Sequence, residues 1–222
     1  MRSVIFANGV LNSPKALVES LKPDDLLIAA DGGLHHLLAL DLFPDVLIGD
    51  LDSVTPEQLE TLPARKVEII QHPVRKDETD LELALLCAVE RGASEILVHG
   101  ALGARWDMTL GNILLLSHPR LRIANIRLVD GNQELRLLVG GETLTLSGQP
   151  GDTVSILPLC GDAVGVTTQG LEYALANERL KFGFTRGLSN VLQASPAKIS
   201  LQKGLLCVVK EGAEVAKDAK DT

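Results

Sequence analysis

The chain has 222 residues, of which 45% are hydrophobic and 23% are charged, and its formal net charge at pH 7 is −8. There is enough apolar material for one or two globular domains, while the acidic balance excludes a broad nucleic-acid-binding surface and favours small molecules or proteins as partners. The first nine residues turn polar too early for a signal peptide, and no apolar run could span a membrane, so we expect a cytosolic protein without membrane association.

Apolar runs and helix-like segments alternate through the first half of the chain. Ser13-Pro14 and Thr55-Pro56 each resemble an N-cap followed by a first-turn proline, and Thr79 with Glu82 has the spacing of a capping box. This alternation predicts an α/β fold, with a mostly parallel open sheet and helices on both of its faces. The predicted strands lie at Ser3–Ala7, Asp25–Ala30, Val46–Ile48, Val67–Ile70, Glu95–His99 and Ile126–Val129.

The pattern changes after about Asp130. Turn signals such as Gly140-Gly141 and Gly148 to Gly151 separate short stretches rich in Val, Leu, Ile and Thr, without a helical period. We therefore predict two domains, an α/β domain over residues 1–132 and a smaller all-β sandwich or roll over residues 133–211. Residues 212–222 are mostly Lys, Asp, Glu and Ala, and we predict a disordered tail there.

Two carboxylates, Asp50 and Asp52, directly follow the apolar run Val46–Ile48. They would therefore lie at the carboxyl end of a buried strand, which is the edge of an open α/β sheet where ligands bind. Aspartate oxygens suit a hard cation such as Mg²⁺ that also contacts phosphate oxygens. A solvated acidic turn is the alternative, since Gly, Asp and Ser are common in loops.

Residues suited to binding phosphate or metal follow each of the other predicted strands of the first half as well. Repeated carboxylates at one edge would repel one another unless a cation lies among them, and a divalent ion with bound polyphosphate meets that need. Glycine backbones approach anions closely, and Arg105 offers a planar fork for phosphate. Neither a Walker A loop nor a G-x-G-x-x-G motif is present. The segments are Asn8-Gly9, Asp31-Gly32-Gly33, Asp50–Ser53, Lys76–Asp80 and Gly100–Asp107.

In order and spacing these motifs resemble those of the thiamine pyrophosphokinases. The segments Asp31-Gly32-Gly33, Gly49–Ser53, Asp77–Asp80 and Gly100–Asp107 carry the resemblance in the first half, and Gly183–Asn190 carries it in the second. Two departures bear on substrate positioning. Met108 stands where bacterial members often have His, and Phe184 is larger than the residue expected at its position.

The resemblance implies transfer of pyrophosphate from ATP to thiamine, which gives thiamine diphosphate and AMP. It implies Mg²⁺, an α/β catalytic domain that binds the nucleotide, a β-rich domain that binds thiamine, and a homodimer with the active site at the subunit interface. By motif, the catalytic residues are Asp50, Asp52, Asp77 and Asp80, with Asp50, Asp52 and Asp80 meeting around the metal. Residues for ATP are Asp31, Gly32, Gly33, Ser53, Lys76, Thr79, Arg105 and Asp107, and residues for thiamine are Thr185, Ser189 and Asn190.

Other interpretations remain open. A related enzyme that transfers pyrophosphate to another alcohol, such as a hydroxymethylpterin, would keep the aspartates, and a nucleotide or thiamine sensor would keep the fold without catalysis. Asp31 has an alternative role as a helix N-cap, and Trp106 and Tyr173 as core or interface residues. His35 and His36 are expected to be surface or satisfied core histidines rather than metal ligands, because no Cys or second His occurs at metal-binding spacing.

Overall fold

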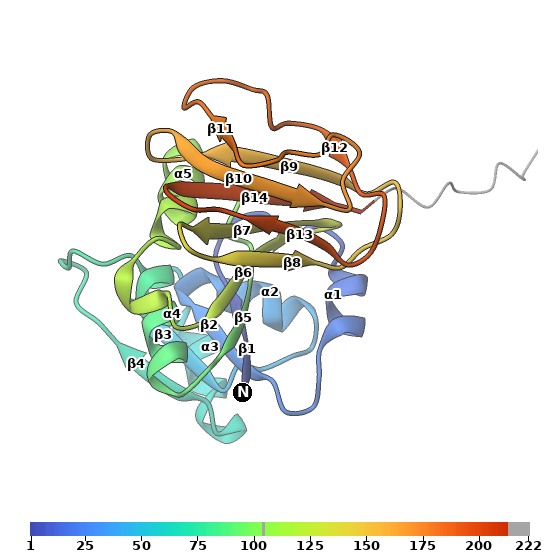
Figure 1. Cartoon of the computed structure of the whole chain (residues 1–222). Coiled ribbons are helices and arrows are strands. Elements are labelled where there is room, and N and C mark those ends of the chain that lie inside the picture. Colours follow the sequence, from blue (N-terminus) through green and yellow to red (C-terminus); the bar gives the residue numbers. More distant parts are fainter. Residues whose placement is uncertain (104, 213–222) are drawn as a thin grey trace, which may run out of the picture. The chain divides into compact units, whose positions relative to one another are not determined.

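A computed structural model describes residues 1–103 and 105–212 of the chain (Figure 1). Contacts within the chain divide it into two compact units, the first formed by Met1–Gly131 and the second beginning at Asn132. The predicted tail falls outside the described residues except for Gly212, whose N–H donates to the carbonyl of Asn132 at 3.0 Å. In the described ranges no helix is long and apolar enough to cross a bilayer.

The first unit is built on six parallel strands in the order β6-β5-β1-β2-β3-β4. Because all six run in the same direction, their carboxyl ends meet at one edge of the sheet. The strands are β1 (Arg2–Phe6), β2 (Leu26–Ala30), β3 (Val46–Gly49), β4 (Glu68–Gln71), β5 (Glu95–His99) and β6 (Asn125–Asp130). The helices are α1 (Pro14–Ser20), α2 (Leu34–Ala39), α3 (Pro56–Thr61), α4 (Asp80–Glu90) and α5 (Trp106–Leu115), with single turns η1 (Asp31–Gly33), η2 (Pro63–Arg65) and η3 (Pro119–Leu121).

Helices cover both faces of this sheet, as the sequence predicted. Leu17 of α1 and Leu34 and Leu37 of α2 are buried in one apolar cluster with Phe6 and Leu47 of the strands. Figure 1 shows α4 on the opposite side from α1 and α2, and α4 buries Leu81, Ala84, Leu85, Cys87 and Ala88. The inner strands β1, β2, β3 and β5 are largely buried on both faces for this reason, whereas the edge strand β4 is mostly exposed.

Two of the three predicted helix starts are capped as expected. Thr55 Oγ1 accepts from the N–H of Gln58, and Gln58 Oε1 accepts from the N–H of Thr55, which completes a capping box. Thr79 Oγ1 accepts from the N–H of Glu82 at 3.2 Å and fixes the first turn of α4. Ser13 precedes α1 in a left-handed conformation with φ of 54° and makes no side-chain cap, so only the proline signal was correct there.

The second unit is an antiparallel β-sandwich. One sheet has the order β12-β9-β14-β7 and the other β11-β10-β13-β8. Side chains of both sheets form one core, in which Ile156 and Val208 meet Val166 and Ile199. The strands are β7 (Gln133–Val139), β8 (Thr143–Leu146), β9 (Thr153–Pro158), β10 (Ala163–Gln169), β11 (Glu178–Leu180), β12 (Asn190–Val191), β13 (Ala197–Ser200) and β14 (Leu205–Glu211). The predicted fold class, a parallel α/β unit followed by an all-β unit, is confirmed.

Candidate active site

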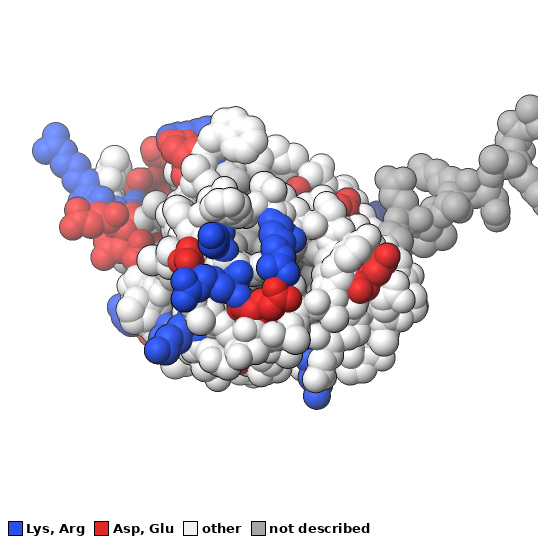
Figure 2. All heavy atoms as spheres, turned by 45° about the horizontal axis from the view of Figure 1, so that its top comes forward, with Lys and Arg blue, Asp and Glu red and all other residues white. Residues whose placement is uncertain are grey.

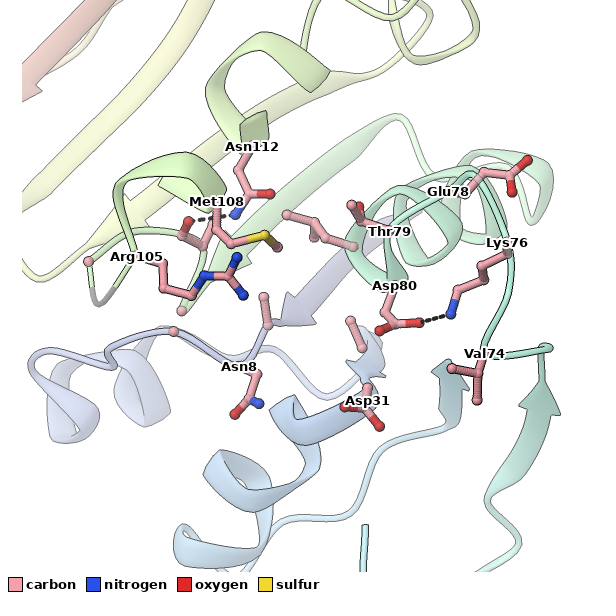
Figure 3. A pocket seen from close by; sticks show the side chains of 17 residues that line it. Asn8, Asp31, Val74, Lys76, Glu78, Thr79, Asp80, Arg105, Met108 and Asn112 are labelled. Atoms are coloured by element: carbon pink, nitrogen blue, oxygen red, sulfur yellow. Dashed lines mark hydrogen bonds and ion pairs between the residues drawn. The ribbon is translucent and has the colours of Figure 1, made fainter. Parts of the chain in front are cut away.

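A pocket of about 360 Å³ lies at the carboxyl edge of the parallel sheet (Figure 3). Its walls come from the segments after β1, β2, β4 and β5 and from α4 and α5, because parallel strands bring these loops to one edge. The lining residues are Ala7, Asn8, Gly9, Ala30, Asp31, Val74, Lys76, Glu78, Thr79, Asp80, Leu81, Gly100, Ala101, Gly103, Arg105, Met108 and Asn112.

Glycines let the loops of this edge pack against one another. A Cβ on Gly33 would lie 1.9 Å from the carbonyl oxygen of Phe6, and one on Gly32 would lie 2.4 Å from the Asn8 side chain. The segment after β5 approaches as closely, since the Gly9 N–H donates to the carbonyl of Gly100 at 2.7 Å. A side chain at Gly33 would require the backbone to move, and one at Gly32 would displace the Asn8 side chain. Gly9 and Gly100 themselves line the pocket.

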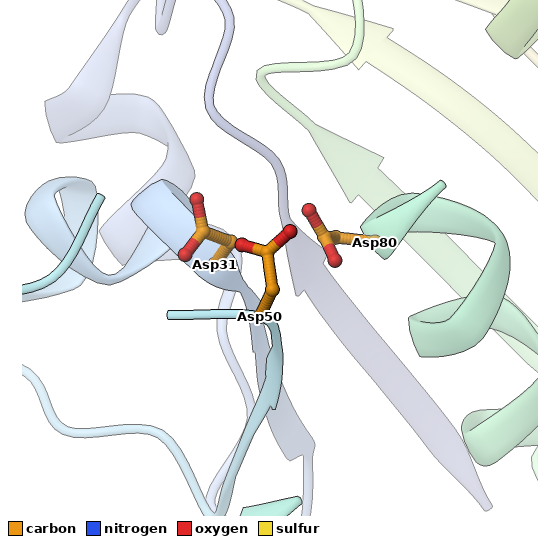
Figure 4. A group of neighbouring side chains, drawn as sticks. All are labelled: Asp31, Asp50 and Asp80. Atoms are coloured by element: carbon orange, nitrogen blue, oxygen red, sulfur yellow. The ribbon is translucent and has the colours of Figure 1, made fainter. Parts of the chain in front are cut away.

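Three carboxylates from separate elements converge beside the pocket. Asp31 follows β2, Asp50 follows β3 and Asp80 opens α4, and one oxygen from each lies within 4.8 Å of the others (Figure 4). Asp31 is only 6% exposed, and its Oδ1 is buried without a hydrogen-bond partner among the described residues. Hard oxygen donors and a buried unsatisfied oxygen suit a divalent cation such as Mg²⁺, so these residues fit the metal that the family motifs imply.

This group differs from the predicted one in a single member. Asp31 occupies the place expected for Asp52, whose side chain is exposed and accepts from the Ser53 hydroxyl at 3.1 Å. The reason is local: Leu51 adopts a left-handed conformation, with φ of 67°, and is buried in the apolar cluster. The chain turns between the two aspartates, and the Asp52 N–H donates to Asp50 Oδ1 at 3.3 Å, while the Asp52 carboxylate lies outside the group of three. The alternative role of Asp31 as a side-chain N-cap is not observed at η1 or α2.

Lys76 is the cation that contacts these carboxylates. Its Nζ lies 3.1 Å from Asp50 Oδ2 and 3.0 Å from Asp80 Oδ1, and its side chain is 11% exposed. The hydrogen bond to Lys76 lowers the pKa of Asp50 from its usual value. Burial raises the pKa of Asp80, and the neighbouring Asp50 and Asp31 charges add to it, despite the opposing contact with Lys76. One ammonium therefore offsets only part of the negative charge of three carboxylates.

Arg105 and Asp107 flank the start of α5 and pair with each other. Arg105 Nε donates to Asp107 Oδ1 at 3.1 Å and its terminal nitrogen donates to Oδ2 at 2.5 Å, in a two-point contact. The pair raises the pKa of Arg105 and lowers that of Asp107. Both side chains are mostly exposed. Of the two, only Arg105 lines the pocket. The guanidinium is thus held at the pocket mouth by a carboxylate that solvent also reaches.

Other predicted residues of this edge are spread over its loops. Thr79 lines the pocket while capping α4, whereas Asp77 and Ser53 lie outside the lining residues. Sequence reasoning gave no role to Asn112, which is 7% exposed and donates from Nδ2 to the carbonyl of Ala101 at 2.7 Å, joining α5 to the glycine loop. In the sequence, Asn112 lies shortly after the Gly100–Asp107 segment without belonging to it, and Met108 is only a departure from the family pattern.

His36 near this edge has a structural hydrogen bond, whereas His35 and Trp106 are exposed. His36 Nε2 lies 2.9 Å from the carbonyl of Gly9, so it is a satisfied structural histidine as predicted, and His35 is exposed. Trp106 is 84% exposed, which excludes a role in the core of its unit.

In the second unit the predicted thiamine residues differ in their contacts. Asn190 is 7% exposed and its side chain holds the backbone. Oδ1 accepts from the N–H groups of Tyr173 and Val191, at 3.0 and 2.9 Å, and Nδ2 donates to the Tyr173 carbonyl at 2.9 Å. Thr185 and Ser189 are exposed. A loop-fixing role thus accounts for the Asn190 amide, while the two hydroxyls face solvent.

Exposed aromatic residues surround this loop. Tyr173, Phe182 and Phe184 are 65%, 55% and 64% exposed, so Tyr173 does not fill the β core. Charges of the same unit are paired locally, as in the Arg186–Glu178 contact. On the face shown in Figure 2, basic side chains lie beside acidic ones within a largely uncharged surface.

Comparison with known proteins assigns both units. A family model described as "Thiamin pyrophosphokinase, catalytic domain" matches residues 17–128, and one described as "Thiamin pyrophosphokinase, vitamin B1 binding domain" matches residues 142–206. The chain belongs to the thiamine pyrophosphokinase family. This confirms the family predicted from the motifs and the enzyme class that goes with it, and it does not favour the pterin-directed or sensor alternatives.

Individual members of the thiamine pyrophosphokinase family agree in sequence and fold. Thiamine pyrophosphokinase of Bacillus subtilis is 30% identical over 207 residues, covering 91% of this chain and 97% of the relative. Its crystal structure superposes with a TM-score of 0.84 at 29% identity, over 96% of this chain and 99% of that one. The thiamin pyrophosphokinase of Geobacillus thermodenitrificans gives a TM-score of 0.82 at 26% identity, over 97% and 99%.

Proposed function

We propose that the chain transfers the pyrophosphoryl group of ATP to the hydroxyl of thiamine, with thiamine diphosphate and AMP as products. The observation that carries this proposal is the group formed by Asp31, Asp50 and Asp80, which lies at the pocket edge inside the segment matched by the catalytic family model. The thiamine oxygen forms a bond to the β-phosphorus, and the bond from that phosphorus to the oxygen that bridges it to the α-phosphorus breaks. That oxygen leaves with AMP, and the hydroxyl proton passes to water.

Asp31, Asp50 and Asp80 would hold Mg²⁺, which when bound offsets the negative charge of the polyphosphate. Lys76 and Arg105 donate to phosphate oxygens from two sides of the pocket. Backbone N–H groups of the glycine segments after β2 and β5 allow the phosphates to approach closely. Phosphoryl-type transfer asks little covalent help from protein, so positioning and charge are what these residues supply.

The acceptor is proposed to bind at the exposed loop of the second unit. Thiamine carries a positive thiazolium ring and a polar aminopyrimidine, which suit aromatic faces and hydroxyl groups. Tyr173 and Phe184 offer such faces, and Thr185 and Ser189 offer the hydroxyls. Asn190 keeps a place in this proposal as the residue that fixes the loop at Tyr173.

The motif resemblance also leads us to propose a homodimer whose active site uses both subunits. Mixing an Asp80→Asn chain with a chain that combines Tyr173→Ala, Phe184→Ala and Ser189→Ala tests this, provided that each parent alone is strongly impaired, because subunit exchange would rebuild one intact site in each mixed dimer. Activity above both parents is expected. No gain after confirmed exchange would indicate a site complete within one chain. The cytosolic location stays a prediction from sequence.

Incubation of the pure protein with ATP, Mg²⁺ and thiamine, followed by chromatographic separation of products, tests the reaction itself. We expect thiamine diphosphate and AMP in equal amounts, and no product when a chelator removes the metal. Formation of ADP with thiamine monophosphate would contradict pyrophosphoryl transfer. Product from a hydroxymethylpterin in place of thiamine would contradict the acceptor.

A further inference from the structure

Lys76 occupies the space between two carboxylates of the proposed metal site. Its ammonium is within about 3 Å of both, at 3.1 Å from Asp50 Oδ2 and 3.0 Å from Asp80 Oδ1. The side chains of Lys76, Asp50 and Asp80 are 11%, 12% and 27% exposed, so water screens these contacts only in part. Figure 3 shows the lysine reaching across to Asp80 from the loop before α4.

A divalent ion at the same group would bind the same carboxylates. Asp50 and Asp80 are two of the three members whose oxygens lie within 4.8 Å of one another. Mg²⁺ binds carboxylate oxygen at about 2.0–2.1 Å, and a cation at that distance would stand close to the ammonium and repel it. The two positive charges therefore compete for the same pair of carboxylates.

A polyphosphate bound in the pocket would give the Lys76 ammonium other partners. Lys76 and Asp80 both line it, and a polyphosphate bound there would present oxygens that accept from a lysine. A lysine has a long flexible stem and three donors, so a change of partner needs no backbone movement.

We propose that Lys76 is an internal counter-ion of the nucleotide-free chain, one that a divalent cation must displace from Asp50 and Asp80 and that then pairs with phosphate. The inference rests on the proposed metal-dependent function. It makes metal binding to the free chain weak, and it couples metal to nucleotide, because phosphate takes up the displaced ammonium. Such coupling is reciprocal, so metal strengthens nucleotide binding by the same factor.

The opposite role for Lys76 makes the opposite prediction. If the ammonium served to hold the carboxylates in a metal-ready arrangement, its removal would leave three repelling carboxylates, and metal affinity would fall. Competition instead predicts that removal of the ammonium strengthens metal binding. The sign of one measurement separates the two.

The measurement is the Mn²⁺ dissociation constant of the full chain without nucleotide, followed by the loss of the free Mn²⁺ electron paramagnetic resonance signal. Lys76→Gln should tighten Mn²⁺ binding at least tenfold. Lys76→Arg keeps the charge and should stay within about threefold of the wild type. Arg75→Gln removes an equal charge at the exposed adjacent residue and should change the constant less than twofold. Adding Asp80→Asn to Lys76→Gln should abolish the tightened binding.

Weaker or unchanged Mn²⁺ binding in Lys76→Gln overturns the proposal, and so does equal tightening in Arg75→Gln, since that would reflect net charge alone. Absence of Mn²⁺ binding in every variant overturns it together with the metal site. Circular dichroism and urea unfolding confirm that each variant is folded. The proposed reaction is judged separately, by product formation, so tenfold tightening without thiamine diphosphate formation would leave the competition intact and refute the acceptor.

Discussion

Buried polar side chains at the two predicted binding regions differ in whether their hydrogen bonds are satisfied within the chain. At the pocket of the first unit, Asp31 keeps a buried oxygen without a hydrogen-bond partner among residues 1–103 and 105–212. At the loop of the second unit, Asn190 uses its amide on the backbone of Tyr173 and Val191, and Thr168 Oγ1 accepts from the N–H of Leu175 at 2.8 Å. An unsatisfied buried oxygen is costly in the free chain and is useful only when something binds it, whereas a satisfied amide stabilises the fold.

The comparison predicts opposite effects of mutation in the two regions. Polar residues of the pocket should matter for turnover and little for stability, and buried polar residues of the β loop should matter for stability first. The largest effect is expected at the pocket, and the smallest at the exposed hydroxyl of the loop.

Asp31→Asn is expected to lower turnover about a thousandfold, which corresponds to about 4 kcal/mol of transition-state stabilisation. Asparagine keeps the shape and tolerates the left-handed conformation that Asp31 adopts, with φ of 44°. The urea midpoint should not fall, because one of three repelling carboxylates is removed. Asp24→Asn, at an exposed aspartate before β2, is the matched control. Retained turnover, or a lowered midpoint, would place Asp31 among structural residues.

His99 is a buried, unsatisfied polar side chain of the first unit that does not belong to the pocket. It is 5% exposed with Nε2 unpartnered among the described residues, yet it faces Phe6 and lies outside the pocket lining. Burial lowers its pKa to about 4. The unfolded chain therefore takes up a proton near pH 6.5, before the folded chain does, and this contribution to stability is lost as the pH falls from 6.5 to 4. A buried unsatisfied atom of a ring packed against Phe6 thus carries only a stability cost.

Urea unfolding at pH 7 and at pH 4.5 measures that cost. The wild type should lose about 2–3 kcal/mol more than His99→Leu over this interval, as linkage predicts for a group shifted by about two and a half units. Subtracting the variant removes the titration of other groups. Equal losses in both proteins would mean that His99 is protonated without penalty in the folded chain.

Asn190→Ala is expected to destabilise the chain by about 1–3 kcal/mol, since it deletes three partly buried hydrogen bonds to the backbone of Tyr173 and Val191. The free energy of unfolding in urea measures this. Its effect on catalysis should appear in the Michaelis constant for thiamine, through displacement of the loop. An unchanged unfolding free energy with a large rise in that constant would make Asn190 a direct ligand.

Ser189→Ala should have the smallest effect. Loss of one exposed hydroxyl should weaken thiamine binding by about 0.5–1.5 kcal/mol and change stability less than Asn190→Ala does. The Michaelis constant for ATP should stay nearly constant. A shift of the ATP constant without one for thiamine would assign this loop to the wrong substrate.

The sequence by itself determined the order of the elements and most of the chemistry. Alternating strands and capped helices such as α4 predict a parallel sheet, and a parallel sheet places the residues that follow its strands at one edge. Asp50 and Asp80 could therefore be assigned to one site from the chain alone. The motifs also identified the family, because the order and spacing of motifs can be read from the sequence.

Only the tertiary structure decided which side chains meet. Asp50 and Asp52 are equivalent in the sequence pattern, yet the carboxylate that converges with Asp50 and Asp80 is that of Asp31, which follows a different strand. Asp52, beyond the left-handed Leu51, contributes its N–H to Asp50. In the same way, Asn190 resembles a ligand until its amide is seen to hold the backbone of Tyr173. Local sequence sets the strands and caps through nearby contacts, whereas the partners of a side chain depend on packing between residues distant in the chain.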